Sequence, residues 1–197
     1  ALTLLPLLPD AALRLVEHLT DDAPLAPHDA REIVRRADGN TLFLRELIEA
    51  LRSTGTTESL PDSVEAFVGG EIDRLTPADR TVLRYAAVLG AAFDPGLLAE
   101  AVRLEVELDG GVWSRLGALV EPGVDGRLRF RNPLVRDAAY EGLPFRRRRE
   151  LHERVGLAIE AGAGSSVGEE VGTLALHFHE AQRWDKAWTY ALAAAAF

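Results

Sequence analysis

The chain contains no cysteine, no methionine and a single lysine among its 197 residues. Without cysteine there is no disulfide, no thiolate nucleophile and no cysteine-ligated zinc, which fits a reducing, cytoplasmic location. The lack of methionine, even at position 1, suggests a segment of a longer protein. The single lysine, Lys186, stands against many arginines and indicates coding bias rather than function.

Long apolar runs and a positive net charge are also absent. No stretch approaches the roughly 20 apolar residues of a membrane-spanning helix, and the leucine-rich start has no basic leader and is interrupted by Pro6 and Pro9. We therefore expect no membrane span and no targeting signal. The net charge of −9 argues against nonspecific binding to a polyanion, because phosphate contacts need a clustered positive surface.

What is present is a chain that is 47% hydrophobic and helical in its periodicity almost throughout. Apolar spacing and helix-start residues predict helices over residues 9–20, 27–37, 41–52, 61–75, 77–89, 95–102, 110–119, 145–160, 169–181 and 184–197. Residues 120–121 and 128–130 are predicted to be the strands of a hairpin with its turn at 122–126. The predicted fold class is mainly α, with one small β-hairpin.

Three parts are expected along the chain. The polar loop at 53–59 has no periodicity and marks the first boundary. We expect a three-helix bundle at 1–53, a winged-helix domain at 54–143, and a linker helix with a helical hairpin at 144–197. In that last hairpin small residues alternate with Trp184 and Tyr190, as in tetratricopeptide-like (TPR-like) arrays. One pair cannot cover its own apolar faces, so further C-terminal repeats are expected.

Three segments resemble a known family. Residues 36–51, RADGNTLFLRELIEAL, look like the lid-helix motif usually written GNPxFLxEL, and residues 60–94 are similar to the helices that open the family's winged-helix region. Residues 129–143, RFRNPLVRDAAYEGL, resemble its FRHxLVRxAAY element. Together they resemble the STAND class of signal-transduction ATPases, whose AAA-like module occurs in large LuxR-type transcriptional regulators and in related nucleotide cyclases and kinases.

The resemblance implies a regulatory segment of an ATP/ADP-dependent switch that controls a LuxR-type transcriptional regulator, with a cyclase or kinase as the alternative effector. Residues 1–53 would be the last strand of the ATPase core, at 2–7, and the helical lid. No GxxxxGK[ST] phosphate-binding loop occurs, so we expect this chain not to be an enzyme and not to bind nucleotide alone. The parent would be the NTPase and would bind ATP or ADP with Mg²⁺. Its partners would be the N-terminal ATPase core, further C-terminal repeats and a nucleotide-driven homo-oligomer.

Two helix starts are the candidate nucleotide-binding positions, because a helix N-terminus presents unpaired N–H groups and partial positive charge. Gly39, Asn40 and Thr41 match the family's GxP motif beside the adenine, with Thr41 in place of the proline. Asn132 matches the family's histidine that senses the β-phosphate of ADP, but it supplies only a neutral hydrogen bond. Both ends would clamp ADP in the resting state, and ATP would release the winged helix. The alternative is that both asparagines are ordinary helix caps.

The arginine cluster allows a second interpretation, a winged helix that binds DNA. The cluster consists of Arg127, Arg129, Arg131, Arg136, Arg146, Arg147, Arg148 and Arg149. A solvated or acid-paired face is the simpler account, because the last four begin an amphipathic helix. The helix expected to enter a groove has the apolar character of core at Val112, Trp113, Leu116 and Leu119. We therefore expect no direct DNA binding by this segment.

A third class of function is a helical scaffold that makes only protein contacts. His177 and His179 could suggest a metal, but two residues apart on a helix they point roughly 200° apart. We therefore expect structural roles for both and no metal site. No Ser-His-Asp set or close carboxylate pair is evident, so no catalytic residue is predicted.

Overall fold

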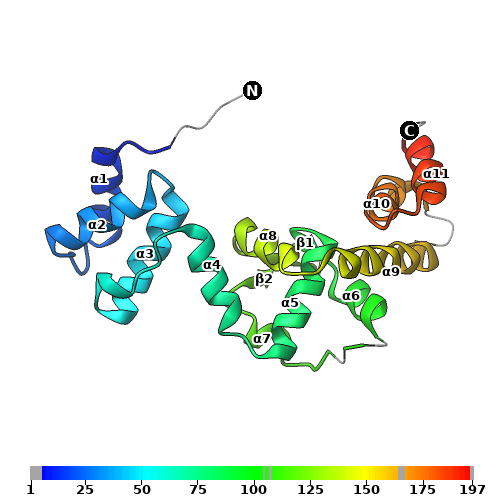
Figure 1. The fold of residues 1–197 in the computed structure, drawn as a ribbon, viewed down its shortest axis with the longest axis horizontal. Helices are drawn as coiled ribbons and strands as arrows, with labels where there is room; N and C mark the ends of the chain where they lie inside the picture. The colour runs from blue at the N-terminus through cyan, green and yellow to red at the C-terminus, as the bar shows by residue number, and fades with distance from the viewer. Residues whose placement is uncertain (1–5, 104, 107, 164–166, 196–197) are drawn as a thin grey trace. The chain divides into compact units, whose positions relative to one another are not determined.

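The protein is described by a computed structural model that covers residues 6–103, 105–106, 108–163 and 167–195 (Figure 1). Contacts divide the chain into two compact units, Ala1–Gly70 and Glu71–Phe197. The helix α4 (Val64–Asp73) contains the division between the two units.

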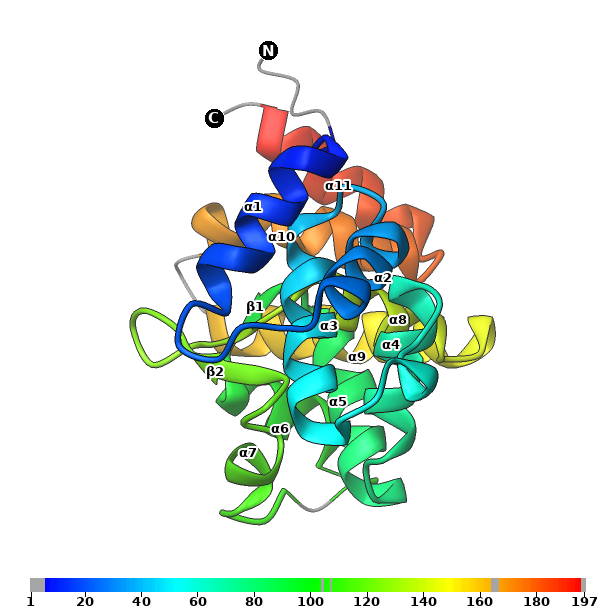
Figure 2. The same cartoon turned by 90° about the vertical axis from the view of Figure 1, so that its left-hand side faces the viewer.

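The first unit is a helical bundle around one apolar core. Its elements are α1 (Pro9–Leu19), α2 (Pro27–Ala37), α3 (Thr41–Thr54), the short 3₁₀ helix η1 (Thr57–Ser59) and the start of α4. Figure 2 shows α1, α2 and α3 together, and each of the three contacts the other two. The core is formed by Ala12, Val16, Ile33, Ala37, Phe43, Leu44, Leu47, Ile48, Leu51 and Leu60. A proline in the first turn starts α1 and α2, where its missing N–H has no helical partner to lose.

The second unit combines helices of different lengths with a small sheet. Its elements are α5 (Pro77–Leu89), β1 (Ala92–Phe93), α6 (Pro95–Val102), α7 (Val112–Arg115), β2 (Val120–Pro122), β3 (Leu128–Phe130), α8 (Pro133–Glu141), α9 (Phe145–Ala163), α10 (Val167–Glu180) and α11 (Trp184–Ala195). The structure confirms the predicted fold class, which is mainly helical with one small hairpin. From α5 to β3, the order of elements is the one expected of a winged helix.

The sheet is antiparallel with the order β1-β3-β2. In the hairpin, Val120 pairs with Phe130 and Pro122 with Leu128. Its turn contains Gly126 with a φ of 75°, a left-handed conformation that glycine adopts without strain. On the other edge, Phe93 of β1 pairs with Leu128, and its ring lies 5.7 Å from that of Phe130. The aromatic rings thus join the sheet to the core of this unit.

The last three helices pack in sequence, α9 against α10 and α10 against α11. A Cβ atom at Gly156 of α9 would lie 3.0 Å from the Phe178 ring of α10, so the small residue allows the two helices to approach closely. The same ring stacks on Tyr190 of α11, with 5.7 Å between ring centroids. The predicted helical hairpin at the end of the chain is therefore present in the described residues.

Several predicted bounds differ from the structure. The expected helix at 110–119 is shortened to α7, because the N–H groups of Gly117 and Leu119 bond three residues back in turns. The strand β1 has no counterpart in the sequence prediction. The expected core strand at 2–7 lies outside the described residues except for Pro6 and Leu7, which are not in a strand. The predicted three-part division stays a prediction, and the compact first unit extends to residue 70 rather than 53.

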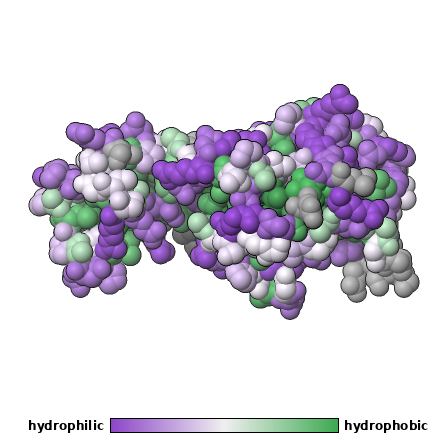
Figure 3. Space-filling model, turned by 90° about the horizontal axis from the view of Figure 1, so that it is seen from below, coloured by the Kyte–Doolittle hydropathy of each residue, from purple (hydrophilic) through white to green (hydrophobic). Residues whose placement is uncertain are grey.

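Hydrophilic residues cover much of the face seen in Figure 3, with hydrophobic residues in smaller groups between them. Among the described helices, none is both long and apolar enough to cross a membrane.

Leu174 and Leu176 on α10 provide a matched test of packing in the second unit. Leu174 is completely buried, whereas Leu176 is 57% exposed. We expect Leu174→Ala to lower the free energy of unfolding by about 2–5 kcal/mol, because it removes buried methyl groups and leaves a cavity. Leu176→Ala should change it by less than about 0.5 kcal/mol. Urea denaturation followed by circular dichroism measures both, and equal losses would contradict the packing of α10.

Candidate functional site

Gly39 is required by the close approach of the N-terminal segment. Its φ of 77° is left-handed, and its carbonyl oxygen accepts a hydrogen bond of 3.0 Å from the Leu7 N–H. A Cβ atom here would lie 2.7 Å from Cβ of Pro6 and 2.8 Å from the Leu7 oxygen. Any other residue would therefore be strained twice, by its own backbone and by the segment packed on it.

An open pocket of 730 Å³ lies beside Gly39, within the first unit. Residues 6–9, Leu13 and Val34 give it apolar walls, and its charged lining residues are Arg31, Arg35 and Asp38. Pockets of 300–1,000 Å³ with a few polar groups are typical ligand sites. The pocket is thus of a suitable size and character for part of a nucleotide.

Arg35 is held in place by Glu32 on the same helix, which also contacts Arg36. The Arg35 Nη2 to Glu32 Oε1 distance is 2.6 Å, and the Arg36 Nε to Glu32 Oε1 distance is 2.7 Å. Hydrogen bonds from the two guanidinium groups lower the pKa of Glu32 to about 2. Arg36 also donates to the carbonyl oxygen of Leu60, which ties α2 to the segment after η1.

Asn40 and Thr41 begin α3. The Asn40 Oδ1 accepts hydrogen bonds of 3.1 Å from the N–H groups of Leu42 and Phe43, which is the geometry of an N-cap. Both side chains are exposed. Within the described residues, the Asn40 Nδ2 and the Thr41 hydroxyl make no hydrogen bond. These two groups are thus donors available to a ligand at this helix end.

Asn132 caps α8 in the second unit. Its Oδ1 accepts a hydrogen bond of 2.9 Å from the Leu134 N–H, and its backbone oxygen accepts one of 3.1 Å from the Val135 N–H. The residue is 7% exposed. Its amide Nδ2 has no hydrogen-bond partner in the described part of the chain.

The structure thus brings Gly39, Asn40 and Thr41 together at one helix end, and it places Asn132 at another in a different unit. Both asparagines cap their helices, as the alternative interpretation of the sequence expects. A cap uses only the amide oxygen, so the amide nitrogen of each is left over. Their role in nucleotide binding stays a prediction.

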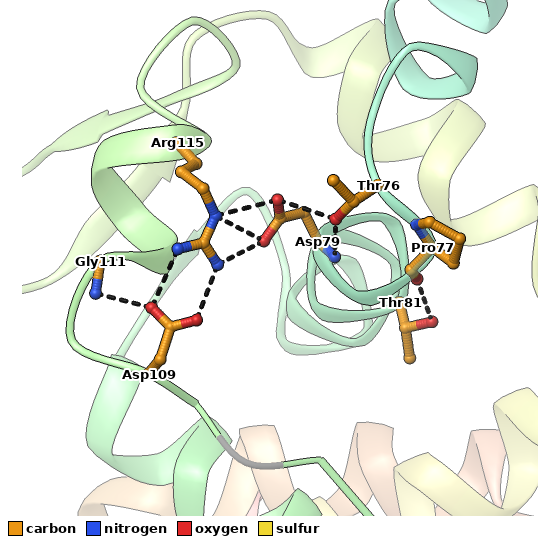
Figure 4. A network of polar contacts seen from close by, with 7 residues as sticks. All are labelled: Thr76, Pro77, Asp79, Thr81, Asp109, Gly111 and Arg115. Carbon is orange, nitrogen blue, oxygen red and sulfur yellow. Dashed lines mark hydrogen bonds and ion pairs between the residues drawn. The ribbon is translucent and has the colours of Figure 1, made fainter.

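A buried ion pair that the sequence analysis missed joins α5 to α7 (Figure 4). Asp79 is 4% exposed, and its carboxylate accepts hydrogen bonds from Arg115, the shortest being 2.7 Å from Nη2. The same carboxylate accepts a bond of 3.0 Å from the Thr76 hydroxyl, whose oxygen in turn caps the Asp79 N–H. Arg115 also binds Asp109, whose carboxylate accepts from the N–H of Gly111 at 2.7 Å.

The charges of this network stabilise one another. Hydrogen bonds from Arg115 lower the pKa of Asp79, against the effect of burial, which alone raises it. The pKa of Asp109 is lowered mainly by Arg115 and then by the Gly111 N–H. The two carboxylates in turn raise the pKa of Arg115. The residue pair is separated by 36 positions, and no local pattern in the sequence indicates it.

Two buried histidines form a second network that the sequence analysis missed. The Nδ1 atoms of His152 on α9 and His177 on α10 are 2.9 Å apart, and the Nε2 of His152 lies 3.0 Å from the Tyr140 hydroxyl. Burial lowers the pKa of His152 to about 3, helped by His177, and lowers that of His177 to about 4. By contrast, His179 is exposed beside Glu180 and Trp184. His177 and His179, the two histidines of α10, thus both contact neighbouring side chains.

Most of the arginine cluster is engaged within the chain. Arg129 and Arg131 contact Glu121, Arg136 contacts Asp137, and Arg146 and Arg147 contact Glu150. Arg148 donates to the backbone oxygens of Leu143 and Glu141. On the helix expected to enter a DNA groove, Val112, Leu116 and Leu119 are buried, and Arg115 is held by its two carboxylates.

Comparison of the chain with models of protein families, with curated proteins and with solved structures finds no match.

Asp79 makes stability depend on pH in the acidic range. Because its pKa is lower in the folded chain than the ordinary value of 3.8, its contribution is complete above that value and is lost as the pH falls through the folded pKa. We expect Asp79→Asn to lower the urea midpoint at pH 7 and to differ less from wild type at pH 3. Asp125→Asn, at an exposed turn position, is the control with the same change of charge. A difference between Asp79→Asn and wild type that is the same at pH 7 and at pH 3 would contradict the pairing of Asp79 with Arg115.

The histidine pair gives a second pH dependence. Both rings are neutral when folded, and the unfolded chain takes up protons below a pKa near 6.5, so stability falls between pH 6.5 and 4. The expected loss is up to about 1.4 kcal/mol per pH unit for each histidine. Histidine NMR resonances measure the same property, and those of His152 and His177 should not move between pH 7 and 5. Titration of either near pH 6.5 would show that the pair is not buried.

Proposed function

We propose that this chain is a regulatory segment of a nucleotide-dependent signal-transduction ATPase, and that it binds ATP or ADP only together with an N-terminal ATPase core. The controlled output would be a LuxR-type transcriptional regulator, or else a cyclase or kinase. The observation that carries the proposal is the Gly39 helix end, where Gly39 lines a 730 Å³ pocket and the next two residues have donors that the fold does not use.

The residues of this helix end suit a nucleotide. Asn40 Oδ1 already accepts from the Leu42 and Phe43 N–H groups, so the donors left for a ligand are the Asn40 amide nitrogen and the Thr41 hydroxyl. Leu13 and Val34 line the pocket and would contact a base, and Arg31, which also lines it, would contact an anion. When bound, the nucleotide would supply the charge and bulk that distinguish the two states of the switch. No ATPase activity is assigned to this chain.

The Leu7 contact supports a link to an upstream core. The segment at Pro6 and Leu7 packs on Gly39 and is joined to it by a backbone hydrogen bond. The two segments are so close that a Cβ atom at position 39 would lie 2.7 Å from Pro6 and 2.8 Å from Leu7. A displacement of this segment would therefore alter the helix end directly. We propose that the position of an upstream core is transmitted to the lid in this way.

Direct DNA binding has less support. Five of the clustered arginines contact carboxylates in the described structure, and α7 has one turn of helix with buried apolar residues. A DNA reader needs free cationic and amide side chains toward base edges. The protein-scaffold alternative predicts neither nucleotide nor DNA binding.

Substitution of Asn132 tests the proposal in the parent protein, extended upstream to include the core. Asn132→Ser keeps an oxygen that can cap α8 but removes the amide donor. We expect ADP affinity to fall by about 2–10-fold, the value of one neutral hydrogen bond. Asn132→His should instead strengthen ADP binding, since a protonated imidazole makes a charge-assisted bond.

Isothermal titration calorimetry with ADP and ATP measures these changes, with the present chain alone as control. Equal ADP affinity in wild type and in the serine and histidine variants would remove Asn132 from the nucleotide site. No binding by the extended parent would remove the proposed function itself.

A further inference from the structure

A second polar pocket, of 310 Å³, lies within the second unit. One wall is a single face of α10, which presents Glu170, Thr173 and His177 at spacings of three and four residues. Other lining residues come from the β1–α6 segment, including Phe93 and Asp94. The end of α9 and Arg127 of the hairpin also line the pocket.

The most buried polar residue that lines the pocket is His177, which is 3% exposed. Its Nδ1 is hydrogen-bonded to His152, and its Nε2 has no hydrogen-bond partner in the described part of the chain. One ring nitrogen of this residue is therefore left to a ligand.

One tautomer of this hydrogen-bond chain places a proton on that nitrogen. The Tyr140 hydroxyl has one side-chain hydrogen-bond partner among the described residues, the Nε2 of His152, and it can donate its proton there. His152 then carries its own proton on Nδ1 and donates it to Nδ1 of His177. In this tautomer His177 carries its proton on Nε2 and offers an N–H donor to the pocket.

The charged groups of the pocket are of both signs. Glu170 and Arg127 form no ion pair within the described residues, so both charges are available to a ligand. One oxygen of Asp94 is already bonded to the Gly96 N–H at 2.7 Å. Between these groups the walls are apolar, with Leu89, Leu97 and Ile159. The arrangement is suited to a molecule that has an acceptor, a cation and an apolar part.

We propose that this pocket binds a small zwitterion, an α-amino acid with an apolar side chain. Its carboxylate would accept from the His177 Nε2–H and from Arg127, and its ammonium group would donate to Glu170. Its side chain would lie against Leu89 and Leu97. The volume of 310 Å³ suits a ligand of this size rather than a nucleotide. The proposal does not rest on the nucleotide proposal above, because the whole pocket lies in this chain and its ligand is not a nucleotide.

The first experiment uses the wild-type chain and L-leucine as the probe, followed by NMR of the histidine rings. Before addition, the ¹⁵N spectra should show the Nδ1–H tautomer for His152 and the Nε2–H tautomer for His177. Leucine should shift the resonances of these two rings and leave those of His18 and His28 unchanged. No shift at His177 under saturating leucine would overturn the proposal without any variant.

Two analogues test the two charged ends of the ligand. 4-Methylpentanoate has the carboxylate without the amine, and 3-methylbutylamine has the amine without the carboxylate. We expect each to bind at least about tenfold more weakly than leucine, because a charge-assisted hydrogen bond is lost. Binding of either analogue as tight as that of leucine would overturn the zwitterion assignment.

Paired variants on α10 test the site itself. Glu170→Gln should weaken leucine about 3–10-fold, a modest change because this carboxylate is exposed, whereas Glu180→Gln outside the pocket should not. His177→Gln should weaken it about tenfold, with His179→Gln as the exposed control. If His177→Gln does not fold, Thr173→Val provides the second variant in the same wall. Leucine affinity that is equal across the pocket variants and their controls would overturn the proposal.

Discussion

The buried carboxylate of Asp79 is the interaction on which the first half of the second unit depends. A carboxylate removed from water costs free energy unless it is paired and fully hydrogen-bonded. Thr76 at the start of α5 donates one hydrogen bond to this carboxylate, and Arg115, which is 36 residues away, donates the others. The pairing requires α7 to lie against the N-terminus of α5. The Trp113 ring then lies 5.5 Å from that of Phe93, beside the sheet.

The helices that the sequence predicted best are those whose ends have local signals. The predicted ranges 27–37, 77–89 and 95–102 coincide with α2, α5 and α6, each of which has a proline in its first turn. The strand at 128–130 was also found, because Leu128 and Phe130 alternate with arginines. By contrast, β1 is only two residues long and exists because it pairs with β3. No pattern of two residues can indicate such a strand in advance.

The candidate site, like the helices, could be predicted only where its residues have local signals in the sequence. Asparagine before an apolar run indicates a cap, and both asparagines are caps. A glycine just after a helix indicates the left-handed backbone of Gly39, but its contact with Pro6 and Leu7, more than 30 positions earlier, has no signal in the sequence. The same limit applies to His152 and His177, which are 25 positions apart and meet only because α9 and α10 pack together. Contacts between elements, rather than the elements themselves, are what sequence patterns leave out.

One face of the α10–α11 pair is buried within the unit, whereas another face is exposed. One face packs on α9, where Phe178 and Leu174 are completely buried. Outside that face, Trp184 is 58% and Trp188 68% exposed, and they line an apolar groove of 460 Å³ with Ala187. A helix pair in a stacked array buries both faces against its neighbours. The covered face is therefore complete within this unit, and the tryptophan face is the one that the proposed further repeats would have to cover.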